Sequence, residues 1–339
     1  MQQQTLAGFD APVDNKAKLE QKFIVPPFSV LDTRQGYWQE RKRTWLSLGI
    51  KSEVGRGENL LKYSDTLLSF GKTFANKENH KGVLHKGETG KNWEDDYKGG
   101  DCWSGSGTSI FDPVLCELIY KWFCPEQGTI LDPFAGGSVR GIVASLLGYN
   151  YYGIDLTRPQ IEANIEQAKE IVPNKQPSWF IGDSSKLDSI LPIALKFDLV
   201  FSCPPYHDLE KYSDDMDDLS NMSWDTFKGK YKEIISKAIL KLKPNRFACF
   251  VVSEIRDDKG FYKGLVPFTI DTFRQGGMWY YNELILVNSV GTLPLRAEGF
   301  FKYRKMGRTH QNVLIFFKGN TDAIPHYFKD IDTTLLENQ

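Results

Sequence analysis

The chain has 339 residues, a length that allows one large α/β domain with appendages or two smaller domains. Hydrophobic residues make up 41% of it and charged residues 25%, the proportions of an ordinary globular protein. Because the formal net charge is −1, no global positive field indicates a nucleic-acid partner. Any binding of nucleic acid therefore has to come from a local patch.

The cysteines and the apolar runs limit the compartment and the metal chemistry. The five cysteines are scattered, lack the paired spacing of a zinc site and suit a reducing environment, so we predict no metal site and a cytoplasmic location. No apolar run approaches the roughly 20 residues of a membrane span. The N-terminus has no charged start before an apolar stretch. We therefore expect neither membrane association nor a signal peptide.

Composition divides the chain into four predicted segments. Residues 1–22 are polar and predict a flexible tail, and residues 23–107 form an N-terminal extension. The extension contains a basic and aromatic stretch, WQERKRTW, which is a candidate nucleic-acid contact. From about residue 71 it becomes rich in Gly, Lys, Asn and Asp, which predicts a mobile loop. Residues 108–320 form the main domain, and residues 321–339 form a C-terminal tail.

Strand and helix patterns alternate through the main domain. A helix is predicted for PVLCELIYKWF, behind an Asp112-Pro113 cap. The predicted strands contain GTILDPF, YYGIDL, SWFIGDS, FDLVFSCPPY, RFACFVVSEI, NELILVNSV and QNVLIFFKG. This alternation predicts an α/β fold with a doubly wound, Rossmann-like sheet, in which the last two strands form an antiparallel hairpin and the others are mostly parallel.

The segment ILDPFAGGSVRG places an acidic residue and a glycine turn between a strand and a helix. Glycine there allows close approach of a ligand, although a tight turn without a ligand has the same pattern. Asp155 ends the next strand, about 20 residues along the chain from the glycine turn, a spacing at which an acid commonly accepts ribose hydroxyls. Asp183 ends the strand after that. With Asp132, three acids at successive strand ends predict an adenosine site. The dinucleotide pattern G-x-G-x-x-G is absent.

DPFAGGS, GIDL and GDSS resemble the successive S-adenosylmethionine motifs of the DNA amino-methyltransferases, which act on cytosine N4 or adenine N6. TSIFDPVL, just upstream, is similar to that family's additional cofactor motif. The resemblance implies a methyltransferase sheet in which the loop holds the methionine moiety, the second acid the ribose and the third the adenine. The implied cofactor residues are Ile110, Phe111, Asp132, Pro133, Phe134, Ala135, Gly136, Gly137, Ser138, Asp155, Leu156, Asp183 and Ser184.

The predicted catalytic turn is Cys203, Pro204, Pro205 and Tyr206, at the end of FDLVFSCPPY. Two prolines make a rigid turn, which by itself also fits a purely structural role. An exocyclic amine is a weak nucleophile, and oxygens that accept its hydrogens turn its lone pair toward the methyl donor. We expect the Pro204 carbonyl to be one acceptor and Tyr206 to stack on the base after it leaves the helix.

Cys203 departs from the family pattern, which has Asp, Asn or Ser at this position. Sulfur is a weak acceptor, so Ser202, Asp208 or a carbonyl has to compensate. Cys203 is closer to the serine of many cytosine enzymes, which favours cytosine slightly over adenine. A nucleophilic Cys203 that adds to a pyrimidine ring is an alternative, and a catalytically impaired binding module is another.

The cofactor loop precedes the catalytic turn, which is the gamma-like motif order. The stretch SVGTLPLRAEGFFKYRKMGRTHQ interleaves aromatic and basic residues. This pattern fits nucleic-acid contact and a solvated hairpin excursion equally well. Its basic residues are Arg296, Lys302, Arg304, Lys305 and Arg308. We predict DNA as the partner, with RNA as the alternative, and leave monomer or homodimer open.

Two further patterns bear on the biological setting and on the active-site edge. GYWQERKR and THQNVL resemble stretches of phage-encoded DNA methylases, which implies a restriction-modification setting. The acidic stretch HDLEKYSDDMDDLSNMSW follows the catalytic turn and predicts either a solvated loop or an active-site lid.

Overall fold

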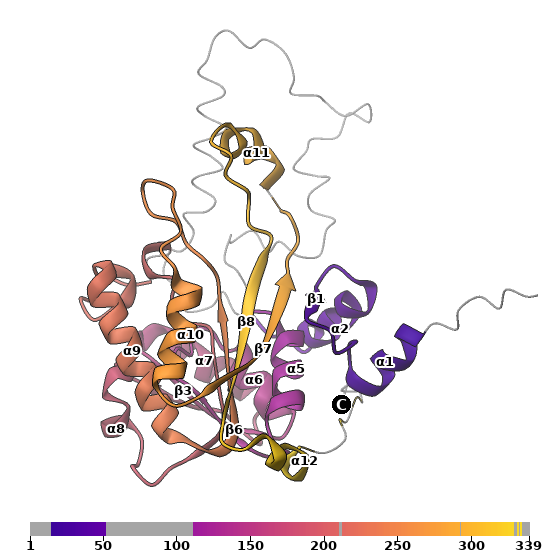
Figure 1. Cartoon of the computed structure of the whole chain (residues 1–339). Helices are drawn as coiled ribbons and strands as arrows, with labels where there is room; N and C mark the ends of the chain where they lie inside the picture. The colour runs from indigo at the N-terminus through magenta and orange to yellow at the C-terminus, as the bar shows by residue number, and fades with distance from the viewer. Residues whose placement is uncertain are drawn as a thin grey trace, which may run out of the picture.

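The computed structural model describes residues 15–51, 111–209, 212–291, 293–328, 331 and 333 (Figure 1). Within them, eight strands form one sheet in the order β1-β7-β8-β6-β5-β2-β3-β4. The strands are β1 (Val30–Asp32), β2 (Thr129–Asp132), β3 (Asn150–Asp155), β4 (Ser178–Ile181), β5 (Phe197–Ser202), β6 (Leu242–Val252), β7 (Trp279–Val287) and β8 (His310–Lys318).

Strand directions confirm the predicted fold class. From β6 through β5, β2 and β3 to β4, all neighbouring strands are parallel. β8 lies between β6 and β7 and is antiparallel to both, so the predicted C-terminal hairpin is present. Because β8 is antiparallel to both β6 and β7, β7 runs in the same direction as β6. The carboxyl ends of β7 and of the parallel strands therefore lie at one edge of the sheet.

Helices cover both faces of this sheet. The helices are α1 (Asn15–Phe23), α2 (Gly36–Ser47), α5 (Pro113–Phe123), α6 (Val139–Leu146), α7 (Arg158–Ile171), α8 (Leu187–Ile190), α9 (Trp224–Lys241), α10 (Leu265–Gln275), α11 (Leu293–Lys302) and α12 (Ile324–Tyr327). The 3-10 turns are η3 (Ser184–Lys186), η4 (His207–Leu209), η5 (Leu219–Asn221) and η6 (Thr321–Ala323). None of the described helices combines the length and the apolar composition needed to cross a membrane.

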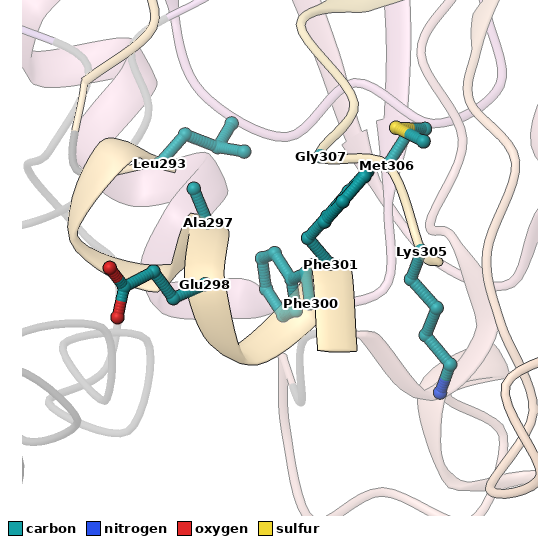
Figure 2. A pocket seen from close by; sticks show the side chains of 8 residues that line it. All are labelled: Leu293, Ala297, Glu298, Phe300, Phe301, Lys305, Met306 and Gly307. Atoms are coloured by element: carbon teal, nitrogen blue, oxygen red, sulfur yellow. The ribbon is translucent and has the colours of Figure 1, made fainter. Parts of the chain in front are cut away.

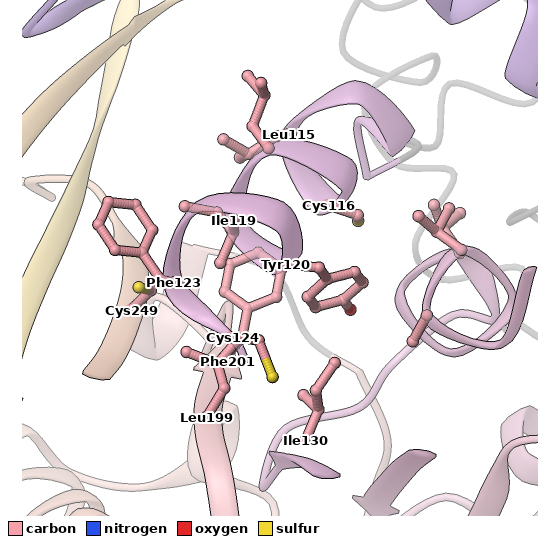
Figure 3. Packing of buried hydrophobic residues seen from close by; sticks show 14 of the residues in the cluster. Leu115, Cys116, Ile119, Tyr120, Phe123, Cys124, Ile130, Leu199, Phe201 and Cys249 are labelled. Atoms are coloured by element: carbon pink, nitrogen blue, oxygen red, sulfur yellow. The ribbon is translucent and has the colours of Figure 1, made fainter. Parts of the chain in front are cut away.

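Side chains of the central strands alternate between two hydrophobic layers. In β6, Phe247 and Cys249 belong to the layer beneath α2, α5, α6 and α7, whereas Ala248 and Phe250 belong to the layer beneath α8, α9 and α10. Figure 3 shows the first layer, where α5 lies over the sheet. The centroid of the Tyr120 ring lies 5.6 Å from that of Phe201 and 5.8 Å from that of Tyr149. A sheet buried on both faces favours strands that are mostly apolar, and β5, β6 and β8 are mostly apolar.

The N-terminal extension belongs to the same sheet. Val30 to Asp32 pair in parallel with β7, on the side of β7 opposite its hairpin partner β8. The predicted flexible tail, 1–22, needs a correction, because α1 already begins at Asn15. Its end is fixed by packing, since the Trp122 indole N–H donates to the Phe23 carbonyl over 3.0 Å. The rest of that tail and the predicted mobile loop lie outside the described residues.

Helix α2 uses its basic residues inside the protein. Arg41 makes two hydrogen bonds of 2.6 Å to the buried Glu117 carboxylate of α5, and the Trp45 indole donates to the same group over 2.9 Å. Lys42 pairs with Asp112 at 3.2 Å. The prediction that WQERKRTW contacts nucleic acid is therefore corrected for Arg41 and Lys42, whose charges are neutralised by carboxylates of the main domain.

The C-terminal boundary also moves. The predicted tail, 321–339, begins with η6 and α12, and residues up to Phe328 pack against the domain. The Arg246 guanidinium lies 4.0 Å from the centre of the Tyr327 ring, and the Phe328 ring lies 5.2 Å from the Phe247 ring. Apolar and aromatic residues in IPHYF supply the free energy that holds this segment on the domain.

Candidate active site

The carboxyl ends of four parallel strands bring the predicted site residues to one edge. Strand pairing sets Asp132 of β2 beside Gly153 of β3, and Asp155 of β3 beside Ile181 of β4. On the other side of β2 lies β5, whose last residue, Ser202, precedes the catalytic turn. Ligands of open α/β sheets bind at such an edge, where the loops after the strands meet.

The glycine loop after β2 is tied to the end of β3. The Gly136 N–H donates to the Asp155 carboxylate over 2.9 Å, and the Asn164 amide donates to the Gly136 carbonyl over 2.7 Å. Gly136 has φ +50°, a left-handed conformation that side chains with a Cβ adopt only with strain. The glycine is thus required by the turn itself, and its backbone stays uncovered at the edge.

Asp132 does not face the site. Its side chain is fully buried, and the carboxylate accepts hydrogen bonds from Arg140 at 2.5 Å, from the Tyr151 hydroxyl at 2.6 Å and from Ser202. The prediction that Asp132 contacts a cofactor is therefore corrected. The reason is Arg140, a buried cation that needs a carboxylate partner in the interior.

Arg140 also holds the glycine loop. Its guanidinium donates to the carbonyls of Phe134 and Ala135, over 2.6 and 2.8 Å, and lies 4.6 Å from the centre of the Phe111 ring. Burial opposes the charge, but the Asp132 carboxylate outweighs it and raises the pKa of Arg140. The Asp132–Arg140 pair is thus the internal support on which the loop is built.

Asp155 lies at the surface of the edge and differs from Asp132. Its side chain is partly exposed, and it accepts the N–H groups of Gly136 and Thr157. Burial raises the pKa of the Asp155 carboxyl above its ordinary value, and these two backbone donors work against that rise. The Thr157 side chain also donates to this carboxylate, and its remaining lone pairs can accept further hydrogen bonds, for instance from hydroxyl groups.

Asp183 and Ser184 attach the end of β4 to the same loop. The Ser184 hydroxyl donates to the Pro133 carbonyl over 2.6 Å, while Asp183 accepts the Ser185 N–H and the Lys230 amine. Burial alone would raise the pKa of Asp183, but hydrogen bonds from Ser185 and Lys230 outweigh it and lower the pKa. Asp183 is therefore held as a carboxylate at the edge.

The other predicted cofactor residues divide by exposure. Pro133, Ala135 and Ser138 are buried within the loop and act through its shape. Partly exposed residues at the edge are Phe111, Phe134, Gly136, Gly137 and Leu156. Ile110 lies outside the described residues.

Tyr206 of the catalytic turn is positioned through its hydroxyl. That hydroxyl accepts the Gln311 amide N–H over 2.9 Å, donates toward the Val251 carbonyl at 3.3 Å and lies 3.6 Å from the Cys203 sulfur. Burial raises the pKa of Tyr206 far above its ordinary value, so the hydroxyl stays protonated. The ring is half-buried, and its orientation is fixed by β6 and β8.

Of the two side chains expected to compensate for Cys203, one is enclosed and the other is paired with a lysine. Ser202 is fully buried and donates to Asp132, so its predicted role is corrected. Asp208 receives two hydrogen bonds of 2.9 Å from the Lys263 amine, which also contacts His207. Because Asp208 is exposed, it stays a predicted acceptor beside the backbone carbonyls of the turn.

The predicted basic cluster lies on the excursion between β7 and β8, at the same edge of the sheet (Figure 1). Lys302 and Arg304 are exposed, and Lys305 is partly exposed. Arg308 instead binds the His310 carbonyl and the Asn312 side chain of β8, so its guanidinium is engaged within the fold. Arg296 lies in α11, and its side chain is outside the described residues.

Three residues of the edge were not predicted from sequence. Arg140 supports the glycine loop, Lys230 bridges Asp183 and Asp217, and Gln311 fixes Tyr206. Only Arg140 left a signal, as a lone cation in the otherwise apolar helix VRGIVASL. Lys230 and Gln311 are separated from their partners by many residues, so their contacts follow from the tertiary fold.

Lys230 also bears on the acidic stretch after the catalytic turn. Asp217 of that stretch lies 2.8 Å from the Lys230 amine, and Asp218 is buried, where it accepts hydrogen bonds from Ser213 and Ser220. The described part of the stretch is therefore anchored beside the end of β4 rather than solvated along its whole length.

No protein-family model matches the sequence, and no curated protein sequence matches it. Among solved structures, the chain is similar to TrmN from Thermus thermophilus, with 14% identity, a TM-score of 0.42 and coverage of 61% of this chain and 49% of TrmN. This chain thus spans about half the length of TrmN.

Two further solved structures are similar at the same level. An rRNA methylase from Streptococcus thermophilus is 9% identical, with a TM-score of 0.40 over 63% of this chain and 100% of its own. Magnesium protoporphyrin IX methyltransferase from Synechocystis PCC 6803, solved with bound SAM, is 13% identical, with a TM-score of 0.36 over 57% of this chain and 71% of its own. At these identities and TM-scores the similarity says nothing about the substrate of this chain.

Proposed function

We propose that this chain is an S-adenosylmethionine-dependent methyltransferase that acts on an exocyclic amino group of a base in DNA, with cytosine N4 favoured over adenine N6. One observation supports it most. The glycine loop, the acids after β3 and β4 and the Pro-Pro-Tyr turn meet at one edge, joined by the Ser184–Pro133 and Ser202–Asp132 hydrogen bonds. These are the motifs that resemble the amino-methyltransferases.

The donor set at the edge fits an adenosylated sulfonium. Asp155 has a partly exposed carboxylate for hydroxyl groups, and Asp183 a second carboxylate beside it. Phe134 and Leu156 offer partly exposed apolar surface for a ring, and the left-handed Gly136 leaves the loop without a side chain there. Asp155, Asp183, Leu156 and the glycine loop would hold the cofactor, which when bound supplies an electrophilic methyl group on sulfur.

The turn residues act on the target base. Tyr206 presents a ring of fixed orientation on which the base stacks, because Gln311 and the Val251 carbonyl hold its hydroxyl. The Pro204 carbonyl accepts a hydrogen bond from the amino group, which localises the nitrogen lone pair. With Ser202 engaged elsewhere and Asp208 paired with Lys263, this carbonyl is the principal acceptor.

The experiment uses labelled methyl groups and three substrates. Purified protein is incubated with labelled S-adenosylmethionine and with duplex DNA, single-stranded DNA or RNA, and the modified nucleoside is identified by mass spectrometry. We expect N4-methylcytosine in DNA. N6-methyladenine would replace cytosine by adenine as the assigned base, and methylated RNA would replace DNA by RNA as the assigned substrate. The binding-module alternative predicts cofactor binding without methyl transfer. Absence of calorimetric binding at millimolar cofactor would contradict the whole proposal.

A further inference from the structure

The excursion between β7 and β8 contains a cavity that the functional site does not use. It has a volume of about 450 Å³ and lies between α11 and the returning chain (Figure 2). Its lining includes Leu293, Ala297, Phe300, Phe301, Lys305 and Met306. In Figure 2, Phe300 and Phe301 project from the end of α11 toward Met306, while the Glu298 carboxylate points away from them. The volume lies within the range of ligand pockets, about 300 to 1,000 Å³.

The rim of this cavity is both aromatic and cationic. Phe301 is 50% exposed and Met306 63% exposed, so apolar surface of the cavity faces the solvent. The Arg304 guanidinium lies 4.7 Å from the centre of the Phe301 ring, and the amines of Lys302 and Lys305 each lie 5.8 Å from the centre of the Tyr303 ring. An occupant with a flat apolar part and a negative charge complements such a rim.

A second loop with the same chemistry borders the first. The loop between β6 and α10 follows the carboxyl end of β6, and the Lys305 amine occupies the space where a side chain on Gly260 would lie. Phe261 and Tyr262 are exposed there, and Arg256 lies 4.1 Å from the centre of the Tyr262 ring. Two segments far apart in sequence thus place aromatic rings and cations side by side at the active-site edge.

We propose that the cavity of α11 binds an unpaired nucleobase of the substrate strand, with Lys305 on the adjoining phosphate, so that the substrate is single-stranded where it crosses this edge. This inference rests on the proposed function and adds the state of the strand. A nucleotide combines a flat base with a nearby phosphate, and a surface on which aromatic rings and cations alternate complements both parts.

The charge of the protein favours a single strand over a duplex. Duplex binding relies on many cations along the phosphates, whereas this chain has a net charge of −1, and Arg41, Lys42 and Arg308 are engaged within the fold. Stacking on rings needs fewer cations, but it requires bases that are not paired. The exposed rings therefore indicate the strand with free bases.

The test measures strand affinity by fluorescence anisotropy. The probe is a short thymidine strand with one cytosine, prepared intact, as a duplex, and with a single abasic nucleotide at each thymidine in turn. We expect the wild type to lose about tenfold in affinity at one abasic position and to bind the duplex more weakly. Phe301→Ala should bind the intact strand with about tenfold lower affinity than the wild type, and the abasic nucleotide that weakens the wild type should not weaken this variant further. Phe301→Tyr should bind like the wild type.

Trp279→Ala is the matched control, because Trp279 is an exposed aromatic at the amino end of β7, on the opposite edge. It should bind like the wild type. Equal binding by Phe301→Ala and the wild type, or tighter binding of the duplex, would overturn the inference while methyl transfer by the wild type still stands. Loss of a dimer in Phe301→Ala, with strand binding unchanged, would assign the cavity to a second copy. A wild type that binds neither DNA form contradicts the proposed function itself.

Discussion

At the residue scale, Asp132 and Asp155 carry the same side chain at the ends of neighbouring strands, yet their surroundings differ. Asp132 is enclosed by Arg140, Tyr151 and Ser202, whereas Asp155 meets two backbone N–H groups and remains partly exposed. A carboxylate paired with a buried cation is a structural support. A carboxylate that is not paired with a buried cation can still bind a ligand, and we assign that role to Asp155.

Tyr206→Ala should abolish methyl transfer and leave cofactor binding nearly intact. The substitution removes the ring on which the base stacks, while the acids after β3 and β4 keep their contacts. Labelled transfer and isothermal titration with S-adenosylmethionine measure the two properties separately. Tyr206→Phe is the control, because it keeps the ring and loses only the hydroxyl, with its contacts to Gln311, Val251 and Cys203. Equal loss of transfer and cofactor binding in Tyr206→Ala would contradict the assigned roles.

Cys203→Ser distinguishes the two chemistries open to Cys203. A hydroxyl accepts hydrogen bonds better than a thiol, so we expect kcat to rise on the order of threefold to tenfold. A nucleophilic cysteine would instead make the serine variant inactive. The measurement is the initial rate of transfer to DNA, with Cys203→Ala as the control that removes the acceptor without replacing it.

At the element scale, the amino ends of the strands are held by a charge cluster far from the site. Asp198 of β5 accepts hydrogen bonds from Lys243 and Arg246 of β6, at 2.8 and 3.0 Å, and from the Thr129 N–H of β2. The cluster therefore joins three parallel strands through one carboxylate. Burial would raise the pKa of Asp198, but these donors outweigh it and lower the pKa below its ordinary value of 3.8.

Asp198→Asn should reduce the free energy of unfolding by about 3 kcal/mol at neutral pH, because Arg246 is left without its carboxylate. A lowered folded-state pKa contributes stability above the unfolded pKa and loses it as pH falls through the folded value. The difference between wild type and variant should therefore be full near pH 7 and shrink below about pH 4. Urea unfolding across that range measures it, and a difference that grows toward acid would contradict the assignment.

At the scale of the whole molecule, the described part of the N-terminal extension belongs to the same sheet and core as the main domain. β1 extends the sheet beyond β7, and α2 packs Trp38 and Trp45 against α5. Covering the edge of β7 also protects it from pairing with another chain. The extension therefore has a structural role over its described residues, and any contact with nucleic acid has to come from charges that remain exposed.

Arg41→Met should cost about 3 to 5 kcal/mol in unfolding free energy, because it leaves the buried Glu117 without its bidentate partner. Arg34→Met is the matched control, since Arg34 pairs with Asp32 on the exposed surface and its loss should leave stability almost unchanged. Denaturant unfolding gives both values. Because Arg41 faces the interior, its variant should retain wild-type DNA affinity under conditions where it is folded. A selective loss of affinity would restore the nucleic-acid role for this helix.

The sequence by itself determined the order of the elements in the main domain and placed the glycine loop and the Pro-Pro-Tyr turn directly after strands. The cofactor role of the loop and the catalytic role of the turn stay predictions. Element order and turn position are local properties: the alternation of apolar residues, the Asp112-Pro113 cap and the glycine and proline turns depend on neighbours in the chain. Helix α11 was not predicted, because its described residues are mostly exposed and give no periodic apolar face toward a core, and β1 and α2 of the N-terminal extension were not predicted either.

Only the tertiary structure decided which of the predicted polar residues face the site. Ser202 is engaged by Asp132, 70 residues away, and Asp208 by Lys263, 55 residues away, and no local pattern reports contacts over such distances along the chain. The free energy of a polar group depends on its burial and its partners, which the fold sets as a whole. The sequence therefore determined what kind of chemistry gathers at this edge, and the packing decided which atoms remain to perform it.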